Sequence, residues 1–571
     1  MFFLALATDY DGTLAAHGKA DPDALACLQR LRKSGRKVIM VTGRELADLV
    51  AVCPELDLFD LIVAENGATL YDPATKEEQM LAPAPSPELV AYLEKADVKP
   101  LSVGRSIVAT WEPNETVVLE AIRDLGLELQ IIFNKGAVMV LPANINKASG
   151  LRAALDRLGL SQHNVVGIGD AENDHAFMQL CGCSVAVENA LDTIKTRVNF
   201  VTRGARGAGV VELCEMLCDN DLADVGPGIP SPMPVLGQTV DGADIPLDPR
   251  AGPLLITGSS GGGKTTTVTS MLERMTELQY QCCVLDPEGD YGAFAGTTTL
   301  GAAKNSPTVD EVLSVLGKAD ASVVCNLLAV PLADRPAFLA KLLPELSHLR
   351  SKTGRPHWIV IDESHHMMPA DWTPMTLPRS LPGIILVTVS PKALTPMLLD
   401  AVETVIGVGD KPHEAVAEFC EAAGLAAPPP LKLPATGEAV YYWRRDGKAE
   451  AVTIEMPQTL QKRHVRKYAE GELGEDRSFY FSGPDGKLNL RAQNLMIFLQ
   501  MAQGVDDETW MHHLRRGDYS EWFLNAIKDP DLAEEARGVE SDASLSAEAS
   551  RKHFAEIVSR RYTAPATKHE S

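Results

Sequence analysis

The sequence predicts a multidomain α/β protein, and three observations lead to that fold class. With 571 residues, the chain is too long to fold around a single hydrophobic core. Strand-like and helix-like segments alternate over residues 1–218 and again over residues 250–458, a pattern typical of parallel sheets covered by helices. Beyond residue 459 the hydrophobic pattern becomes largely helical. We therefore expect two α/β domains followed by a helical domain.

The first domain is expected to span residues 1–218. Its predicted strands are Phe2–Thr8, Lys37–Thr42 and Val165–Gly169, which are short apolar runs. Residues from about 83 to 146 have their own pattern of helix-like and strand-like segments, so we expect a small inserted cap there. Because residues 219–235 are acidic and then rich in Gly and Pro, they are predicted to be a linker.

The second domain is expected to span residues 236–458, and the third residues 459–571. The predicted strands of the second domain are Leu254–Thr257, Cys282–Asp286, Ser322–Leu328, His357–Ile361, Ile384–Val389 and Thr404–Val408. The third domain begins with the basic cluster Lys462–Lys467. Phe479–Phe481 and Leu488–Leu490 are expected to lie in a helical context. The apolar residues that recur with helical spacing are Leu495, Phe498, Leu499 and Ala502.

Composition limits the classes of partner. The formal net charge of −24 argues against a protein that grips nucleic acid over its whole surface, because Lys and Arg dominate such binding. The ten cysteines lack the spacing of metal ligands, so we expect reduced thiols in a cytoplasmic protein rather than a zinc site. No apolar stretch approaches about 20 residues, so no membrane span is expected.

The first candidate site begins with Asp9-Tyr10-Asp11-Gly12-Thr13, directly after a predicted strand. The carboxylates of Asp9 and Asp11 can face one pocket as the chain turns at Gly12. Removal of a phosphoryl group needs a nucleophile, a proton donor for the leaving oxygen and positive charge beside the phosphate oxygens. The downstream residues that offer the remaining groups are Thr42, Lys147, Asp170 and Asp174, the last two as carboxylates for Mg²⁺.

In order and spacing, these segments resemble the four motifs of the haloacid-dehalogenase-like phosphatases, in their Cof-type (subfamily IIB) branch with a C2 cap. The resemblance covers residues 1–218 and implies a Rossmann-like core and an aspartyl-phosphate intermediate. It implies that Asp9 is the nucleophile and Asp11 the acid/base, while Thr42 and Lys147 hold the phosphoryl group. The metal ligands that we expect are Asp9, Asp11, Asp170 and Asp174. The short cap favours a small phosphorylated substrate.

The second candidate site is a glycine-rich loop with the pattern Gly258-x-x-x-x-Gly263-Lys264-Thr265, between an apolar strand and a helix-length run. Such a loop wraps backbone N–H groups around phosphates at a helix N-terminus. Asp362, after an apolar strand, is placed for the Mg²⁺ of ATP, and Glu363 for polarising an attacking water. The expected ATP-binding residues are Gly258, Ser259, Ser260, Gly261, Gly262, Gly263, Lys264, Thr265, Thr266 and Asp362, with Thr265 also as a Mg²⁺ ligand.

Further features of this domain resemble the HerA/FtsK-type ATPases, notably Asp286-Pro-Glu-Gly-Asp-Tyr291 at a strand end. The resemblance implies a RecA-like fold. It also implies homo-oligomers, chiefly hexameric rings, in which an arginine of the neighbouring subunit completes the ATP site. The candidates for that arginine are Arg379, Arg444 and Arg445. Val389 stands where the family has a polar sensor, usually glutamine, and valine cannot form a hydrogen bond. ATP binding is therefore better supported than fast hydrolysis.

Four residues near these motifs have less defined roles. Arg44 is as suited to a cap or salt bridge as to substrate contact, and Arg105 in the cap is expected at the surface. His365 and His366 follow Glu363, but adjacent side chains point apart. We therefore expect packing or loop roles for the two histidines rather than a metal site.

Together the motifs predict a Mg²⁺-dependent phosphomonoester hydrolase joined to an ATP-binding domain with ATPase activity. Two alternatives remain open at this point. One is a nucleic-acid motor whose phosphatase trims polynucleotide ends, against which the acidic charge and Val389 weigh. The other is a regulatory module in which ATP gates the phosphatase, or a kinase that opposes it. The favoured partners are a small phosphorylated substrate and ATP.

Overall fold

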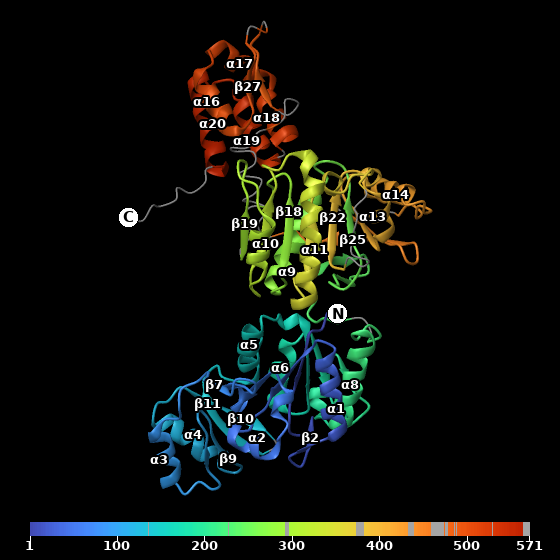
Figure 1. Ribbon diagram of the computed structural model, residues 1–571. Coiled ribbons are helices and arrows are strands. Elements are labelled where there is room, and N and C mark those ends of the chain that lie inside the picture. Colours follow the sequence, from blue (N-terminus) through green and yellow to red (C-terminus); the bar gives the residue numbers. More distant parts are fainter. Residues whose placement is uncertain are drawn as a thin grey trace. The chain divides into compact units, whose positions relative to one another are not determined.

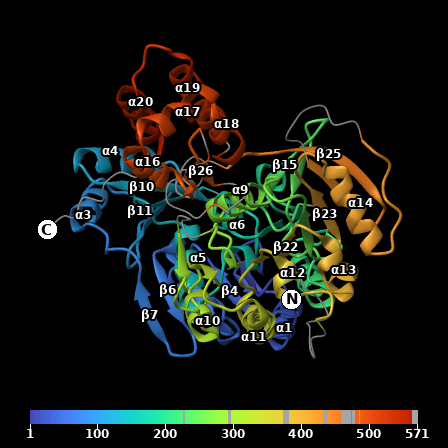
Figure 2. The same ribbon diagram turned by 90° about the horizontal axis from the view of Figure 1, so that it is seen from above.

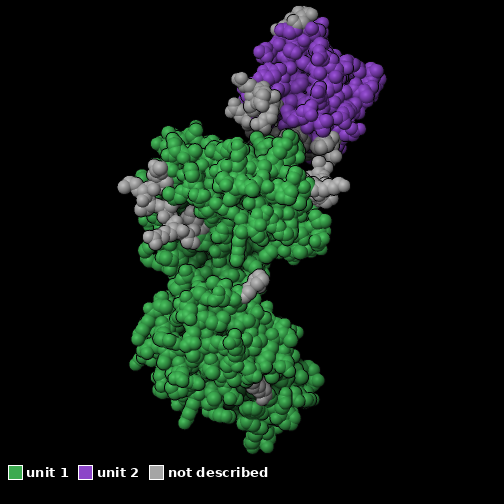
Figure 3. Space-filling view, turned by 90° about the vertical axis from the view of Figure 1, so that its right-hand side faces the viewer, with its two compact units in different colours: residues 1–455 green, residues 456–571 purple. Residues whose placement is uncertain are grey.

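The computed structural model describes residues 1–134, 136–225, 228–291, 296–372, 382–431, 439–457, 473, 478–484, 486, 488–527 and 529–562 (Figure 1). It divides into two compact units, residues 1–455 and 456–571, which Figure 3 colours separately. The basic cluster Lys462–Lys467 and Arg379 lie outside the described residues. Among the described residues, no helix has both the length and the apolar character needed to cross a bilayer.

Within its described residues, the N-terminal part of the first unit forms an eight-stranded sheet in the order β14-β13-β12-β1-β4-β5-β6-β7. The six strands from β14 to β5 are parallel, and β6 and β7 extend the edge in antiparallel fashion. Its strands are β1 Ala5–Thr8, β4 Lys37–Val41, β5 Leu61–Ala64, β6 Thr69–Asp72, β7 Glu77–Met80, β12 Val165–Gly169, β13 Cys183–Ala186 and β14 Phe200–Val201. The three strands predicted in this region are confirmed.

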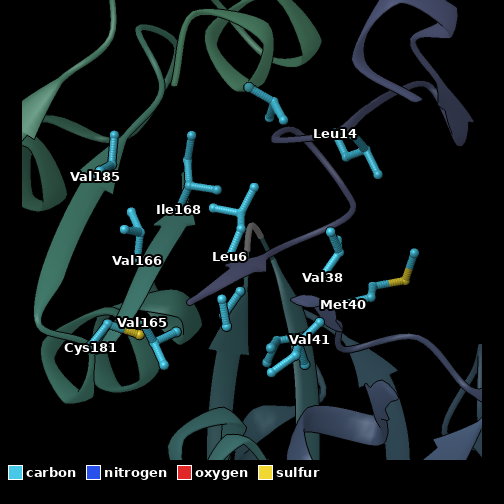
Figure 4. Packing of buried hydrophobic residues seen from close by; sticks show 14 of the residues in the cluster. Leu6, Leu14, Val38, Met40, Val41, Val165, Val166, Ile168, Cys181 and Val185 are labelled. Atoms are coloured by element: carbon cyan, nitrogen blue, oxygen red, sulfur yellow. The ribbon is translucent and has the colours of Figure 1, made fainter. Parts of the chain in front are cut away.

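The central strands are buried on both faces, as the short apolar runs in the sequence require. Leu6 of β1 and Val166 and Ile168 of β12 lie together in the core (Figure 4). The helix α1 begins where Asp21 caps it and Pro22 takes the first helical position, which suits the fixed φ of proline. The helices of this region are α1 Pro22–Lys33, α2 Leu46–Val52, α5 Lys147–Leu158, α6 His175–Leu180, α7 Asp192–Lys195 and α8 Gly207–Asn220.

The predicted cap is a separate layer inserted between β7 and α5. Among the described residues it has a four-stranded antiparallel sheet in the order β10-β11-β9-β8, and α3 and α4 cover one face of it (Figures 1 and 2). Its elements are α3 Pro87–Lys95, β8 Ser102–Val103, β9 Val108–Trp111, α4 Glu115–Asp124, β10 Leu129–Asn134 and β11 Ala137–Pro142. The opposite face, with Met139 and Leu141, packs toward Ala68 of the core.

The rest of the first unit has an eleven-stranded sheet, counted over its described residues, in the order β16-β15-β25-β24-β23-β17-β22-β21-β18-β20-β19. The strands from β23 to β19 are parallel, and the others add antiparallel pairs at one edge. The strands are β15 Val235–Thr239, β16 Asp244–Pro246, β17 Leu254–Thr257, β18 Cys282–Asp286, β19 Thr297–Leu300, β20 Ser322–Asn326, β21 Trp358–Ile361, β22 Ile384–Thr388, β23 Thr404–Gly407, β24 Ala439–Trp443 and β25 Lys448–Ile454.

The six strands predicted for this region are confirmed, each to within a few residues at its ends. Separate apolar clusters cover the two faces of the sheet. The helices around it are α9 Lys264–Glu277, α10 Val309–Leu316, α11 Arg335–Thr353, α12 Ser364–Met367, α13 Pro396–Ala401 and α14 Pro412–Ala422.

The second unit is mostly helical and packs around an aromatic core. Leu495, Phe498 and Ala502 are buried as their spacing predicts, and Leu499 is partly buried. One expectation is corrected: β26 Phe479–Phe481 and β27 Leu490–Ala492 form an antiparallel pair rather than helix. The helices are α16 Leu495–Gly504, α17 Asp507–Arg516, α18 Asp518–Trp522, α19 Pro530–Ser541 and α20 Ala547–Tyr562.

Candidate functional site

The first site lies where three adjacent parallel strands end. Strand β1 pairs with both β12 and β4, so their carboxyl ends meet at one edge of the sheet. Asp9 follows β1, Thr42 follows β4 and Asp170 follows β12. In open α/β sheets this edge is where ligands bind. Residues far apart in the sequence therefore meet as the motif order predicts.

Lys147 joins this edge from the first turn of α5. Asn146 caps that helix by accepting hydrogen bonds from the backbone N–H groups of Ala148 and Ser149, which holds the helix start in place. The Lys147 Nζ lies 2.6 Å from Asp9 Oδ1 and 2.6 Å from Asp174 Oδ1, and all three side chains are buried. The cation thus bridges two carboxylates within the core.

Asp9, Asp170 and Asp174 form a buried cluster that suits a hard cation. One carboxylate oxygen from each lies within 4.8 Å of the others. The second oxygen of Asp174 accepts hydrogen bonds from the backbone N–H groups of Asp170 and Ala171, both at 2.9 Å, which fixes its orientation. An all-oxygen donor set of this charge fits Mg²⁺.

Burial and neighbouring charges shift the pKa values of Asp9 and Lys147. Burial, followed by the charge of Asp174, raises the pKa of Asp9 to about 8, although Lys147 opposes the shift. Burial works against the charge of Lys147, but Asp174 and Asp9 outweigh it and raise the pKa of the ammonium. The site therefore carries a permanent cation beside a carboxyl group that binds a proton near neutral pH.

Mg²⁺ affinity is expected to weaken about tenfold for each pH unit below about 8 and to level off above it. Asp9 has its pKa raised to about 8, so without metal it is protonated at neutral pH, whereas a metal ligand must be a carboxylate. Calorimetric titration across this range, in two buffers with different ionisation enthalpies, measures the affinity and the released protons. An affinity that does not change with pH would contradict this role of Asp9.

The Asp11 side chain is not one of the three clustered carboxylates, and its expected role as a metal ligand stays a prediction. Arg44 donates to both of its oxygens, from Nε at 2.6 Å and from Nη2 at 2.8 Å, and also pairs with Asp48. The Asp11 side chain remains 43% exposed, so solvent or a substrate can reach its carboxyl group. Of the roles considered for Arg44, the structure shows a salt bridge, and this salt bridge lies at the site.

Two polar side chains that the sequence analysis missed support the metal cluster. Asn189 Nδ2 donates to the Gly12 carbonyl at 2.9 Å and lies 3.5 Å from Asp170 Oδ2. Thr13 Oγ1 lies 3.5 Å from Asp170 Oδ1. Thr13 belongs to the Asp9–Thr13 motif and could have been found from it, but no local pattern singles out Asn189.

The cap is tied to the core through Glu65. Its Oε2 accepts from the Ser106 backbone N–H at 2.9 Å and its Oε1 from that of Arg105 at 3.2 Å. The Arg105 side chain is exposed and pairs with Glu78, so its expected surface position is confirmed. The neighbouring Asn66 accepts from Asn173 Nδ2 at 3.0 Å, beside the acidic cluster.

The second site is the loop between β17 and α9. Gly258 has φ of +155°, and an added Cβ would lie 2.2 Å from the Val408 carbonyl oxygen, so a larger residue cannot fit. Gly263 takes a left-handed φ of +93° at the start of α9. Lys264 Nζ donates to the carbonyls of Gly258 and Ser259 at 3.0 and 2.9 Å. The loop thus folds back on itself, so that the Lys264 ammonium group and the N-terminus of α9 lie together.

Asp362 and Glu363 follow β21, and the strand order places β22 between β21 and β17. Burial, then Glu363, raises the pKa of Asp362 to about 7, and burial likewise raises the pKa of Glu363. Burial lowers the pKa of Lys264 although Glu363 and Asp362 oppose the shift. Lys264, Asp362 and Glu363 therefore lie close enough for their charges to interact.

The remaining candidates at this site have local partners. His365 and His366 contact protein groups: His365 lies near Glu363 and Thr388, and His366 near Arg335. Burial, then His366, lowers the pKa of His365 to about 4, so its ring is neutral at pH 7. Arg444 donates to the backbone carbonyls of Leu399, Asp400 and Val402, a structural role.

Two models of known protein families match segments of this chain. The sequence model of the family described as haloacid dehalogenase-like hydrolase matches residues 6–118 and 120–213. The model described as helicase HerA, central domain, matches residues 237–333. The two matches fall on the two sheets of the first unit.

Similar proteins include several archaeal phosphoglycolate phosphatases. That of Methanothermobacter thermautotrophicus is 31% identical over 218 residues, which are 36% of this chain and 96% of the relative. That of Methanosarcina acetivorans is 28% identical over 38% of this chain and 99% of the relative. That of Haloarcula marismortui is 30% identical over 36% of this chain and 94% of the relative.

Proposed function

This chain belongs, through its N-terminal domain, to the haloacid dehalogenase-like hydrolases, and on that premise we propose that it dephosphorylates a small phosphorylated carboxylic acid of the phosphoglycolate type. It is a phosphoric monoester hydrolase that also carries a HerA-like ATP-binding domain. Mg²⁺ is the metal of the hydrolase family and ATP the nucleotide of HerA-like domains. The observation that carries the proposal is the buried arrangement of Asp9, Lys147 and Asp174 at 2.6 Å.

The proposed reaction uses two carboxyl groups in turn. Asp9 attacks phosphorus, and the bond from phosphorus to the leaving oxygen breaks while Asp11 gives that oxygen a proton. Water then attacks the aspartyl-phosphate with Asp11 as base, which returns Asp9 and releases phosphate. Arg44 holds Asp11 in place between these steps, and Lys147 and Thr42 bind the phosphate oxygens. Asp9, Asp170 and Asp174 would hold Mg²⁺, which would supply positive charge to balance that of the phosphoryl group.

The proposed role of the second domain is to bind and hydrolyse ATP. Residues 258–266 would enclose the phosphates, Lys264 would reach the β- and γ-phosphates, and Thr265 and Asp362 would serve the Mg²⁺. Glu363 would polarise the attacking water. The curled loop and the neighbouring acids support this assignment.

We extend the proposal to compartment and assembly. The ten cysteines, all within the described residues, are free, and nine of them are buried, which supports a reducing compartment such as the cytoplasm. Likeness to HerA supports a homo-oligomer formed through the second domain. We propose domain limits of 1–218, 236–458 and 459–571, with 219–235 as the linker.

Phosphoglycolate is expected to be hydrolysed with kcat/KM about tenfold or more above that of ethyl phosphate, which lacks the carboxylate, because a charge-assisted hydrogen bond is worth at least this much. Steady-state release of phosphate, measured for both compounds and for sugar phosphates with and without ATP, tests this. Equal kcat/KM values would reject the carboxylic-acid class. Absence of hydrolysis with every monoester in the presence of Mg²⁺ would reject the assignment of the site.

A further inference from the structure

The strand between the two halves of the ATP site is followed by a residue whose side chain cannot form a hydrogen bond. Strand β22 pairs with β17, which leads into the glycine-rich loop, and with β21, which leads to Asp362 and Glu363. Its last residue is Thr388, followed by the partly exposed Val389. A valine side chain can neither donate nor accept a hydrogen bond. Any polar link between β22 and Glu363 must therefore come from elsewhere.

His365 makes that link. Its Nδ1 lies 3.1 Å from Thr388 Oγ1 and 3.3 Å from Glu363 Oε2. Both distances start from the same ring nitrogen, which is hydrogen-bonded to the Thr388 hydroxyl and has the Glu363 carboxylate beside it. The two partners belong to different segments, the end of β22 and the residue after Asp362. The histidine therefore lies between the end of β22 and the Glu363 carboxylate.

The partners of Thr388 determine which tautomer this contact requires. Thr388 Oγ1 donates its proton to the Ser390 carbonyl at 3.1 Å and accepts from the Ser390 backbone N–H at 3.2 Å. Its remaining lone pair can only accept, and a carboxylate can only accept as well. With the hydroxyl proton given to Ser390, the proton of the neutral His365 ring is on Nδ1 and points to Thr388 Oγ1, with Glu363 Oε2 beside it.

The backbone at Glu363 adds a second constraint. Its φ of 42° and ψ of 51° lie in the left-handed region, which is uncommon for residues other than glycine and is often found at functional sites. Its N–H donates to Asp362 Oδ1 at 2.9 Å. The backbone thus turns at Glu363, and its carboxylate lies beside the His365 ring.

We propose that His365 is a positioning residue for ATP hydrolysis, holding the Glu363 carboxylate toward the attacking water and anchoring it to β22 through Thr388. It takes the part that a glutamine on β22 would play at the position of Val389. This inference rests on the proposed hydrolysis of ATP with Glu363 as the base.

The neighbouring His366 provides a matched control. Its Nδ1 lies 3.4 Å from Arg335 Nη1. It is also partly buried, and it belongs to the same short helix α12. The two rings lie 4.2 Å apart between centroids, so replacing His366 removes an imidazole beside His365 while both contacts of His365 Nδ1 remain.

The test compares His365→Ala, His365→Asn, Thr388→Val and His366→Ala with the unaltered full-length chain. Steady-state ATP hydrolysis gives kcat and KM, and calorimetry with a non-hydrolysable ATP analogue gives affinity. We expect kcat of His365→Ala to fall about 10- to 100-fold with an affinity within about twofold of the parent, as for other supporting contacts of an active site. His365→Asn keeps a donor near the place of Nδ1 and should recover most of the rate.

Coupling between the two residues sharpens the test. Thr388→Val keeps His365 but removes its contact with the Thr388 hydroxyl. The loss of kcat in Thr388→Val should therefore be smaller than the loss in His365→Ala. The double variant His365→Ala/Thr388→Val should be no slower than His365→Ala, because both changes break the same chain of contacts. His366→Ala should retain the parental kcat, and thermal unfolding should show that all variants remain folded.

Three results would overturn the inference. The first is a parental kcat in His365→Ala when the unaltered chain hydrolyses ATP, and this result leaves the proposed ATPase intact. The second is a loss of ATP affinity that equals the loss of kcat, which would indicate a general structural role. The third is an unaltered chain that binds ATP but does not turn it over; this rejects hydrolysis itself, and the role of His365 with it.

Discussion

Asp9→Asn is expected to reduce phosphatase turnover by about 10⁴-fold or more, since loss of a covalent nucleophile removes most of the catalytic advantage of such a site. The amide has nearly the shape of the carboxylate, but it cannot attack phosphorus. It also withdraws one ligand from the acidic cluster and one partner from Lys147, whose Nζ lies 2.6 Å from Asp9 Oδ1. Release of phosphate from phosphoglycolate under saturating Mg²⁺ measures the effect.

The controls for this substitution separate chemistry from folding. Asp192→Asn changes the same kind of residue at a fully exposed position and should leave kcat unchanged. ATP affinity of Asp9→Asn should match that of the parent, because the glycine-rich loop belongs to a different sheet. If Asp9→Asn retained parental turnover at saturating Mg²⁺, then another group would have to be the nucleophile. A simultaneous loss of ATP affinity would instead indicate misfolding.

Much of this first site could be predicted because parallel strands end at the same edge. Asp9, Thr42 and Asp170 each follow a short apolar run, and the pairing of β1 with β4 and β12 brings them together. The position of Lys147 follows the same logic, since it begins a helix beside that edge. The local pattern was sufficient to predict these positions, because each residue is placed at the site by the end of the strand that precedes it.

Contacts made over long sequence separations could not be predicted in the same way. The pairing of Asp11 with Arg44 links two loops that are far apart in the sequence. Asn189 reaches the site from a loop without a recognisable pattern. These contacts depend on side-chain directions that only the packed core determines.

The second unit shows a different limit. Phe479 and Phe481 are both buried with Tyr480 between them, which is the period of a strand. A run of three residues is too short to distinguish that period from one turn of an apolar helix. Pairing with β27 decides the outcome, and that partner is itself only three residues long. Short segments of this kind are settled by tertiary contacts rather than by their own sequence.

Lys264→Ala is expected to weaken ATP binding about 100-fold or more while leaving phosphatase activity unchanged. Removing one partner of a buried, hydrogen-bonded charge pair typically costs about 2–5 kcal/mol, which corresponds to this range of affinity. The Lys264 side chain is buried at the start of α9, where no other cation of the glycine-rich segment 258–266 can replace it. Calorimetric titration with ATP and Mg²⁺ gives the affinity directly.

Lys392→Ala is the matched control, because Lys392 lies in the short segment after β22 but is half-exposed and paired with Glu421. It should bind ATP like the parent. Lys264 also donates to the Gly258 and Ser259 carbonyls, so its removal frees the loop as well as losing the charge. Lys264→Arg keeps the charge but not the fit, and an affinity between those of Lys264→Ala and the parent would show that charge and geometry both contribute. Unchanged affinity in Lys264→Ala would mean that ATP binds elsewhere and that the curled loop serves the fold alone.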